Sequence, residues 1–202
     1  MQTDGYSDSD IEKITIEITN FEANPSNWGE PKWWNSEVDL LAIWEWAEAR
    51  NRIDIMSTIA SPVVARIITN RRLDLRNENY KDWLAKLERL SNQAKADNQI
   101  EFHVSFLEAI WDLIPWQKRN LERLDDILAL YRQLGKPEKI VYYLGLRAKK
   151  LNSLITTRQK DLGEDEIWKS YIEAYKASRE IHFKKRDCTR IGRIRELSRP
   201  QT

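Results

Sequence analysis

The fold of this chain is decided by an apolar stretch in its N-terminal half, Ile55-Met-Ser-Thr-Ile-Ala-Ser-Pro-Val-Val-Ala-Arg-Ile-Ile68. Branched apolar residues recur in it at helical spacing, and they spread over much more than one face of a helix. We therefore expect a central helix that other elements cover on most sides. Ser61-Pro62 lies inside the stretch and has the pattern of an N-cap followed by a first-turn proline, which predicts a kink or a restart of the helix.

Amphipathic segments on both sides of this stretch predict further helices. Ser36 is the expected N-cap of the first one, and Gly135 and Pro137 are expected to end one helix and to begin the next. The segments cover residues 40–47, 80–94, 102–114, 121–131, 140–155, 168–182 and 191–197. Because few glycines and prolines interrupt them, they predict an all-α fold of about six to eight helices, arranged as a multi-helix bundle or a stack of helical hairpins.

Residues 11–21 fit two structures. Ile14, Ile16 and Ile18 alternate as in a β-strand, and their β-branched side chains favour one. The spacing from Ile11 through Ile14 to Ile18 fits a helical stripe equally well. Because no partner strand is apparent elsewhere in the sequence, we expect a helix and keep a short N-terminal strand as the alternative.

The domain organisation is expected to be simple. No low-complexity linker divides the chain, so we expect one helical domain over residues 1–186. This domain includes a tryptophan-rich loop at residues 22–35, which holds two prolines and a glycine. Residues 187–202 are expected to form a basic helical tail.

Residues 131–148 resemble the hairpin turn of a tetratricopeptide repeat, in which a glycine ends the first helix and aromatic and small residues occupy the second. The resemblance covers this one hairpin. Ala148 lies one place off the family spacing, and no second copy appears one period away. The resemblance implies a helix–turn–helix over this segment.

The sequence offers no constellation of residues that predicts an active site. Metal sites need His, Cys or carboxylate ligands at short spacing, yet His103 and His182 lie far apart. His182 and Cys188 form a Cys–His pair, but six residues apart on a helix they would face different directions. Glycine-rich phosphate-binding loops do not occur. We therefore expect a non-enzymatic protein with no metal, no cofactor and no small-molecule substrate.

The cellular compartment follows from general features. One cysteine cannot form an intramolecular disulfide, and residues 1–10 are polar and acidic rather than signal-like. No stretch approaches the ~18 apolar residues that a membrane span needs. We therefore expect a cytoplasmic protein that does not enter a membrane.

Tryptophan is unusually dense near the N-terminus. Five of the nine tryptophans lie between Trp28 and Trp46. Trp44 fits the core face of its helix, whereas Trp46 lies about 200° away around the helix axis, so the two are not expected to point into the same core. Either the loop with Trp33 and Trp34 folds over Trp46, or Trp28, Trp33, Trp34 and Trp46 present an aromatic surface to a partner.

Charge is distributed unevenly along the chain. Residues 1–100 carry 12 basic and 17 acidic residues, and residues 101–202 carry 21 and 15. Clusters of this kind are typical of surfaces that bind phosphates or acidic proteins, and they also occur on solvated helix faces. The residues expected to bind nucleic acid or another anion are Lys136, Lys139, Arg147, Lys149, Lys150, Lys184, Lys185, Arg186, Arg190, Arg193 and Arg195.

These surface features favour a binding role. We expect a helical interaction or adaptor subunit of an intracellular assembly, which docks on a protein partner through the tryptophan-rich region and the basic C-terminal segment. The alternative is a subunit of a ribonucleoprotein complex that binds RNA or single-stranded DNA, by fold-level analogy with small helical subunits of such complexes.

Overall fold

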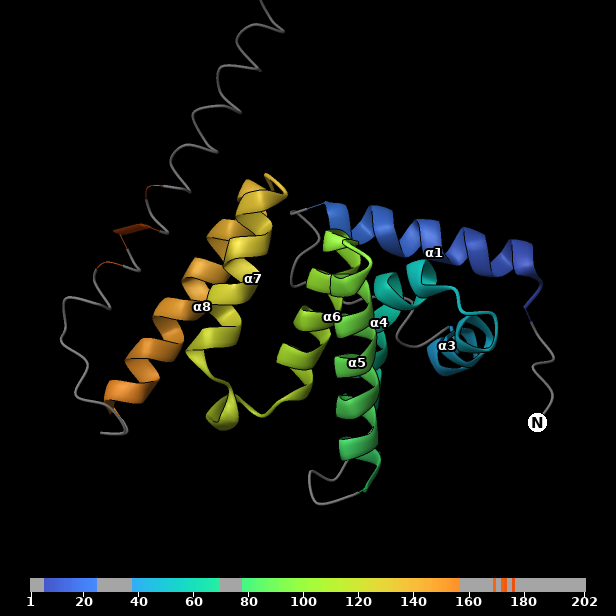
Figure 1. Ribbon diagram of the computed structural model, residues 1–202, viewed down its shortest axis with the longest axis horizontal. Helices are drawn as coiled ribbons and strands as arrows, with labels where there is room; N and C mark the ends of the chain where they lie inside the picture. Colours follow the sequence, from blue (N-terminus) through green and yellow to red (C-terminus); the bar gives the residue numbers. More distant parts are fainter. Residues whose placement is uncertain are drawn as a thin grey trace, which may run out of the picture. The chain divides into compact units, whose positions relative to one another are not determined.

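The computed structural model describes residues 6–24, 38–69 and 78–156, together with Lys169, Ile172, Glu173 and Lys176. The regular elements within these residues are helices, and no strand occurs among them, which confirms the all-α prediction (Figure 1). The chain separates into two compact units, Met1–Arg119 and Asn120–Thr202. The sequence analysis expects a single domain over residues 1–186; the boundary that it places at residue 187 lies outside the described residues.

Unit 1 is built around the apolar stretch of residues 55–68. Its helices are α1 (Asp8–Ala23), α3 (Leu40–Ala49), α4 (Ile53–Thr69), α5 (Glu78–Ala96) and α6 (Ile100–Leu113). Helix α4 packs against α1, α3 and α6, and α5 packs against α6. The predicted central position of α4 is therefore confirmed.

Helix α4 runs through Pro62 without interruption, so the predicted restart at this proline is wrong. Proline removes one backbone donor from a helix and usually disrupts it. Here Ile59, Val63 and Val64, on either side of it, have no exposed surface, and their packing holds the helix together across the missing hydrogen bond.

Residues 11–21 form a helix, not a strand, as part of α1. The helix begins with a capping box, in which the Asp10 N–H donates to the Ser7 Oγ and the Ser7 N–H donates to the Asp10 Oδ2. Ile11 and Ile18 are buried, whereas Ile16 is 59 % exposed. Burial thus follows the helical stripe and not the alternation that a strand would show.

Helix α3 begins three residues later than the predicted N-cap implies. Its N-cap is Asp39, whose Oδ1 accepts hydrogen bonds from the N–H groups of Leu41 and Ala42 at 3.2 and 3.1 Å. Ser36, the predicted cap, lies outside the described residues. The N–H of Asp39 donates to the Tyr6 hydroxyl at 3.3 Å, which ties the start of α3 to the segment before α1.

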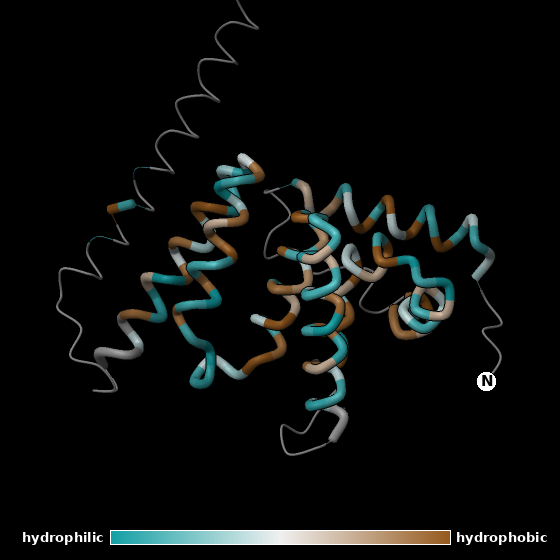
Figure 2. Tube along the Cα trace, in the orientation of Figure 1, coloured by the Kyte–Doolittle hydropathy of each residue, from teal (hydrophilic) through white to brown (hydrophobic). Residues whose placement is uncertain are grey.

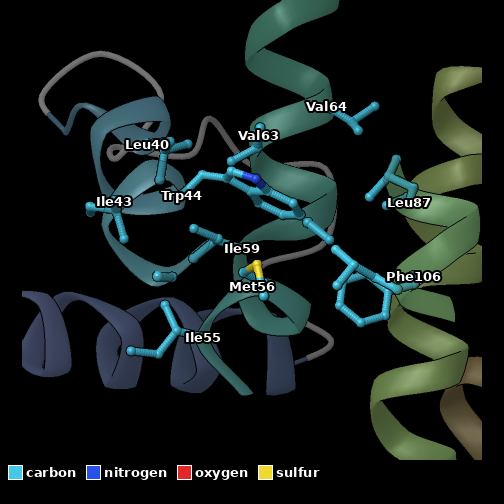
Figure 3. Packing of buried hydrophobic residues seen from close by; sticks show 14 of the residues in the cluster. Leu40, Ile43, Trp44, Ile55, Met56, Ile59, Val63, Val64, Leu87 and Phe106 are labelled. Carbon is cyan, nitrogen blue, oxygen red and sulfur yellow. The ribbon is translucent and has the colours of Figure 1, made fainter. Parts of the chain in front are cut away.

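The core of unit 1 gathers apolar side chains from each of its helices. Figure 3 shows the Trp44 ring beside Ile59 and Val63 of α4, with Leu87 and Phe106 contributed by α5 and α6. These five side chains are at most 1 % exposed. Hydrophilic and hydrophobic residues mix along α5, as expected of an amphipathic helix that covers a core (Figure 2).

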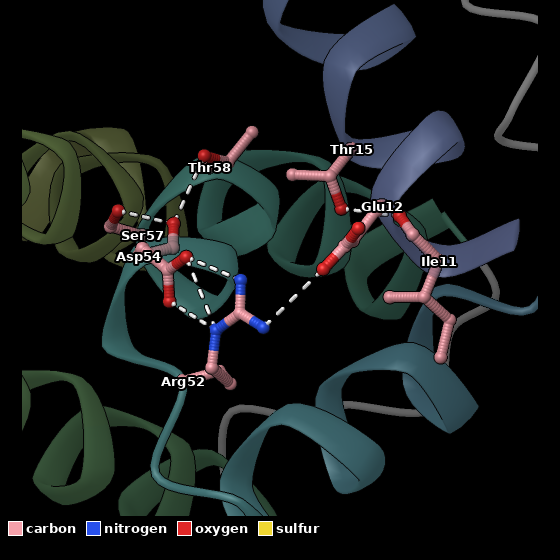
Figure 4. Close-up of polar contacts among 7 residues, drawn as sticks. All are labelled: Ile11, Glu12, Thr15, Arg52, Asp54, Ser57 and Thr58. Carbon is pink, nitrogen blue, oxygen red and sulfur yellow. Dashed lines mark hydrogen bonds and ion pairs between the residues drawn. The ribbon is translucent and has the colours of Figure 1, made fainter. Parts of the chain in front are cut away.

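The connection between α3 and α4 is fixed by a salt-bridged arginine (Figure 4). Arg52 donates from Nε to Asp54 Oδ1 at 3.0 Å and from Nη2 to Asp54 Oδ2 at 2.8 Å, and its Nη1 lies 3.8 Å from Glu12 of α1. The hydrogen bonds from Arg52 lower the pKa of Asp54 below its ordinary value, although partial burial opposes this effect. The hydrogen bonds to Asp54 in turn raise the pKa of Arg52 above its ordinary value.

The C-terminal end of unit 1 is closed by Arg119, which follows a 3₁₀ turn at Trp116–Lys118. The guanidinium of Arg119 donates to the carbonyl oxygens of Ile114 and Asp112 at 2.7 and 3.0 Å. It also lies over the rings of Trp111 and Trp116, 5.0 and 5.6 Å from their centroids. One side chain thus satisfies carbonyls at the end of α6 and covers two aromatic rings.

Unit 2 contains the predicted helix–turn–helix, formed by α7 (Leu121–Gln133) and α8 (Pro137–Thr156). Gly135 has a φ of 62°, in the left-handed region, and ends α7 as predicted. Pro137 is the first residue of α8, also as predicted. The hairpin buries residues from both helices, among them Leu124, Ile127, Leu128, Tyr131, Tyr143, Leu144, Ala148 and Leu151.

Candidate interaction site

Of the four tryptophans predicted to bind a partner, only Trp46 lies among the described residues. Trp28, Trp33 and Trp34 lie outside the described residues. Trp46 is only 8 % exposed, and its Nε1–H donates to Asp8 Oδ1 of α1 at 3.2 Å. The guanidinium of Arg50 lies 4.5 Å from its ring centroid. For Trp46 the structure favours the alternative in which the ring is packed within the chain.

Trp44 and Trp46 are both buried, contrary to the expectation that one core cannot take both. Helix α3 is covered on two sides: Trp44 meets Trp83 of α5, and Trp46 reaches the first turn of α1. The expectation failed because it allowed only one core face for α3. Asp8 was the missed signal, since a carboxylate in a helix N-terminal turn can accept from a distant indole.

A shallow groove of about 240 Å³ lies between α3 and α5, on the side of α3 that carries Trp44. We call it the α3–α5 groove; it is lined by Leu41, Trp44, Glu45, Asp82, Trp83 and Lys86. The Trp44 and Trp83 rings pack edge to face, with centroids 5.1 Å apart. Trp44 is fully buried beneath the groove, whereas Trp83 is half-buried and contributes accessible aromatic surface.

The charged side chains around the groove differ in whether they form ion pairs with other described residues. Lys86 Nζ lies 2.8 Å from Glu48 Oε2, and Arg89 Nη2 lies 3.7 Å from the other oxygen of Glu48. The ammonium of Lys86 also lies 5.2 Å from the Trp83 ring centroid. Glu45 and Asp82 are exposed at the groove, and neither has an ion-pair or hydrogen-bond partner among the described residues. The uncompensated charge of the lining is therefore negative.

The indole N–H groups of Trp44 and Trp111 are buried and have no acceptor among the described residues. In Figure 3 the Trp44 nitrogen points toward Val63, into the apolar core and away from any polar group drawn there. An unsatisfied buried donor costs about 1–3 kcal/mol. This N–H is therefore a feature of the apolar core.

The α3–α5 groove is not apparent from the sequence. Trp83 and Asp82 lie in the segment of residues 80–94 that the sequence predicts to be an amphipathic helix. The groove arises because α3 and α5, which are about 40 residues apart in sequence, lie side by side in the fold. Local periodicity carries no information about such a pairing.

The basic residues predicted to bind an anion are spread over several environments. Lys184, Lys185, Arg186, Arg190, Arg193 and Arg195 lie outside the described residues. Arg147 is paired with Asp125, with 2.7 Å between Nε and Oδ1. Lys150 is 2 % exposed and so does not lie on the expected surface. Lys136 and Lys149 are exposed.

An aromatic and basic face nevertheless occurs on α8. Tyr142 is 48 % exposed and packs edge to face on Tyr143, which stacks on Tyr131 of α7. Lys139 Nζ lies 5.6 Å from the Tyr131 ring centroid. Lys139, Tyr142 and Lys149 share one side of the helix because their positions fall within about 80° around its axis.

Neither metal binding nor acid–base chemistry is indicated in the part of the chain that the structure describes. No group of three or more His, Cys, Asp or Glu side chains there is arranged to hold a metal ion. His103 Nδ1 lies 2.9 Å from Ser91 Oγ, a contact that links α6 to α5. The Cys188 and His182 pair lies outside the described residues. No helix among the described residues has the length and apolar character to cross a membrane.

Comparison with known proteins adds no family assignment. No protein-family model matches this chain. No curated protein and no solved structure matches it either.

Proposed function

We propose that this protein is a non-enzymatic helical interaction subunit of an intracellular assembly, and that the α3–α5 groove is part of its docking surface. The observation that carries the proposal is the pair of carboxylates Glu45 and Asp82, which have no partner among the described residues and lie beside the half-buried ring of Trp83. Half-buried tryptophans with a polar rim are typical of residues that dominate the binding energy of protein interfaces.

The arrangement of the groove supports binding rather than catalysis. Its floor is aromatic and rigid, because Trp83 rests on the buried Trp44. Lys86 is held by Glu48, so the rim is ordered as well. A preformed surface of this kind loses little conformational entropy when a partner binds. The predicted docking residues Trp28, Trp33 and Trp34 and the basic C-terminal segment remain part of the proposal.

The proposal is tested by recovering the tagged full-length chain from its source cells and quantifying the proteins that co-purify. We expect Trp83→Ala to reduce recovery of a stoichiometric partner at least tenfold, because truncating a central aromatic residue of an interface costs about 2 kcal/mol or more. Trp116→Ala is the matched control, since Trp116 is also half-buried but lies outside the groove. Circular dichroism verifies that both variants are folded. A folded Trp83→Ala variant that retains every partner would overturn the proposal.

A second candidate function is binding of single-stranded nucleic acid through α8. The observation that favours it is the exposed ring of Tyr142 between Lys139 and Lys149 on one helix face. Bases stack on aromatic rings with about 1–3 kcal/mol each, and lysines contact the phosphates.

This second function is tested by fluorescence anisotropy with a labelled 20-nucleotide oligo(U) and oligo(dT). Binding should weaken steeply between 50 and 200 mM salt, and Tyr142→Ala with Lys149→Gln should weaken it at least tenfold. Lys118→Gln, which removes an exposed lysine from unit 1, is the control. Binding that is undetectable at 50 mM salt, or that is insensitive to the α8 substitutions, would overturn this candidate.

A further inference from the structure

We infer that the α3–α5 groove binds a positively charged side chain, an arginine in preference to a lysine, presented by a basic segment of a protein partner. This inference rests on the proposed function of the groove and adds the chemistry of its ligand. It follows from the charge, the aromatic surface and the size of the groove.

The charge of the groove selects a cation. Three of the six lining residues are charged: Glu45, Asp82 and Lys86. Lys86 is already neutralised by Glu48 at 2.8 Å, and Glu48 is shared with Arg89 at 3.7 Å. The two carboxylates of the lining have no counter-ion among the described residues. A phosphate or an acidic peptide would be repelled by them, whereas a basic side chain would supply the missing charge.

The aromatic surface of the groove suits the same ligand. Lys86 already lies over the ring of Trp83, which shows that a cation is accommodated against this indole. Elsewhere in unit 1, Arg50 and Arg119 lie over other tryptophan rings at 4.5 to 5.6 Å from the centroids. A guanidinium is planar, stacks on aromatic rings and donates two parallel hydrogen bonds to a carboxylate. Arginine therefore uses both the ring and the carboxylates, whereas the ammonium of lysine is more strongly hydrated.

The size of the groove limits what can enter it. Pockets for small-molecule ligands typically have volumes of roughly 300–1,000 Å³. The α3–α5 groove, at about 240 Å³, falls below this range and suits one long side chain. A partner would insert a single anchor residue here and would contact the flanking surface with the rest of its segment.

The inference is tested by selecting peptides from a displayed random library against the full-length chain, with elution by excess free chain. We expect the selected peptides to contain an arginine next to apolar residues. Each selected peptide is then synthesised with arginine and with citrulline, which has nearly the same shape but no charge. Affinities are measured by fluorescence anisotropy at 50 mM salt.

Glu45→Gln combined with Asp82→Asn removes the two charges of the groove and keeps its shape. We expect this double variant to bind the arginine peptide at least tenfold more weakly, and to bind the arginine and citrulline peptides equally. The matched control is Asp97→Asn combined with Asp126→Asn, which removes two exposed carboxylates outside the groove and should leave the affinity unchanged.

The outcomes separate this inference from the proposed function. Peptides that require Trp83 but bind equally well with citrulline would overturn the arginine assignment and leave the docking site in place. A selection in which no peptide depends on Trp83 would overturn both. An unchanged affinity of the groove double variant for arginine peptides would likewise overturn the inference.

Discussion

The indole of Trp46 is held by a carboxylate that lies 38 residues earlier in the chain, Asp8 of α1. At the scale of single residues, this hydrogen bond explains how a side chain on the second face of α3 becomes buried. The ring fills the space between α3 and α1, and its polar atom is satisfied by the first turn of α1. Without such a partner, the buried N–H would oppose the packing of the ring.

We expect Asp8→Ala to lower the free energy of unfolding by about 1 kcal/mol, because it leaves the buried Trp46 N–H without an acceptor. Asp8→Asn keeps an acceptor oxygen at the same place and should recover most of this loss. Urea unfolding followed by circular dichroism measures both values. Equal stability of the wild-type chain and the Asp8→Ala variant would contradict the role assigned to this hydrogen bond.

The pair of Arg52 and Asp54 makes a pH-dependent contribution to stability. The pKa of Asp54 is lowered in the folded protein, first of all by the hydrogen bonds from Arg52. The pair therefore stabilises the fold above the unfolded pKa of about 4, and this stabilisation is lost as the pH falls through the lower pKa of the folded state. Both side chains are more than one-third exposed, so the contribution is small.

Arg52→Gln should lower the free energy of unfolding by about 0.5 kcal/mol between pH 5 and 7, and the difference should shrink progressively below pH 4. Denaturant titrations of both proteins at several pH values measure this difference. In an Asp54→Asn background, Arg52→Gln should cost less and show no such dependence between pH 2 and 4. A difference that is constant over the whole pH range would contradict this account.

Glycines in two backbone conformations allow a matched comparison at the scale of elements. Gly135 ends α7 with a φ of 62°, a conformation that disfavours a side chain. Gly145 lies inside α8, where an added Cβ would meet nothing within 4 Å. The same substitution should therefore have opposite effects at the two positions.

Gly135→Ala should destabilise the protein by about 1 kcal/mol, because alanine is strained at a positive φ. Gly145→Ala should stabilise it by up to about 1 kcal/mol, because alanine has the higher helix propensity and fits without a clash. Thermal unfolding of both variants under identical conditions measures the difference. An unchanged or raised stability of Gly135→Ala would show that the α7–α8 turn does not require glycine.

The helices themselves could be predicted from the sequence, because apolar residues recur at helical spacing in each of them. The turn at Gly135 and Pro137 was predictable for the same kind of local reason. The predictions failed where the tertiary environment overrides a local signal. Helix α4 continues through Pro62 because the residues around the proline are packed in the core. Helix α3 has Asp39 as its N-cap, whereas the sequence pattern at Ser36 predicted an earlier start.

The candidate site was less predictable than the helices that form it. Of the four tryptophans that the sequence offered either as a binding surface or as packed residues, Trp46 is buried, and Trp28, Trp33 and Trp34 lie outside the described residues. The α3–α5 groove instead combines Glu45 with Asp82 and Trp83, residues whose proximity depends on how two separate helices pack. A single sequence contains no direct signal for that packing.

At the scale of the whole molecule, the chain consists of two units that meet in sequence at Arg119 and Asn120. No glycine-rich or serine-rich linker marks this point, which is why composition did not reveal it. The polarity of charge follows the same division, since acidic residues outnumber basic ones in unit 1 and the reverse holds in unit 2.

Unit 1 should fold on its own. Its buried cluster extends from Ile11 to Leu113, and Arg119 closes the end of α6 with groups from the same unit. We expect a fragment of residues 1–120 to be helical by circular dichroism and to unfold cooperatively in urea. A full-length chain carrying Ile59→Ala should lose about 2–5 kcal/mol of stability because of the cavity left in its core, and the fragment should lose a similar amount. A fragment that is non-cooperative, or that is insensitive to Ile59→Ala, would contradict the independence of unit 1.

The two buried indoles without acceptors, Trp44 and Trp111, have a consequence for observing this protein in solution. Because these protons have no acceptor among the described residues, their exchange with deuterium requires water to reach the buried rings. Exchange at these two sites therefore times the opening of the interior itself, at α3 for one and at α6 for the other. The Trp46 proton, which is bonded to Asp8, provides the comparison. Three resonances from one residue type can thus follow the fluctuations of unit 1 without any added label.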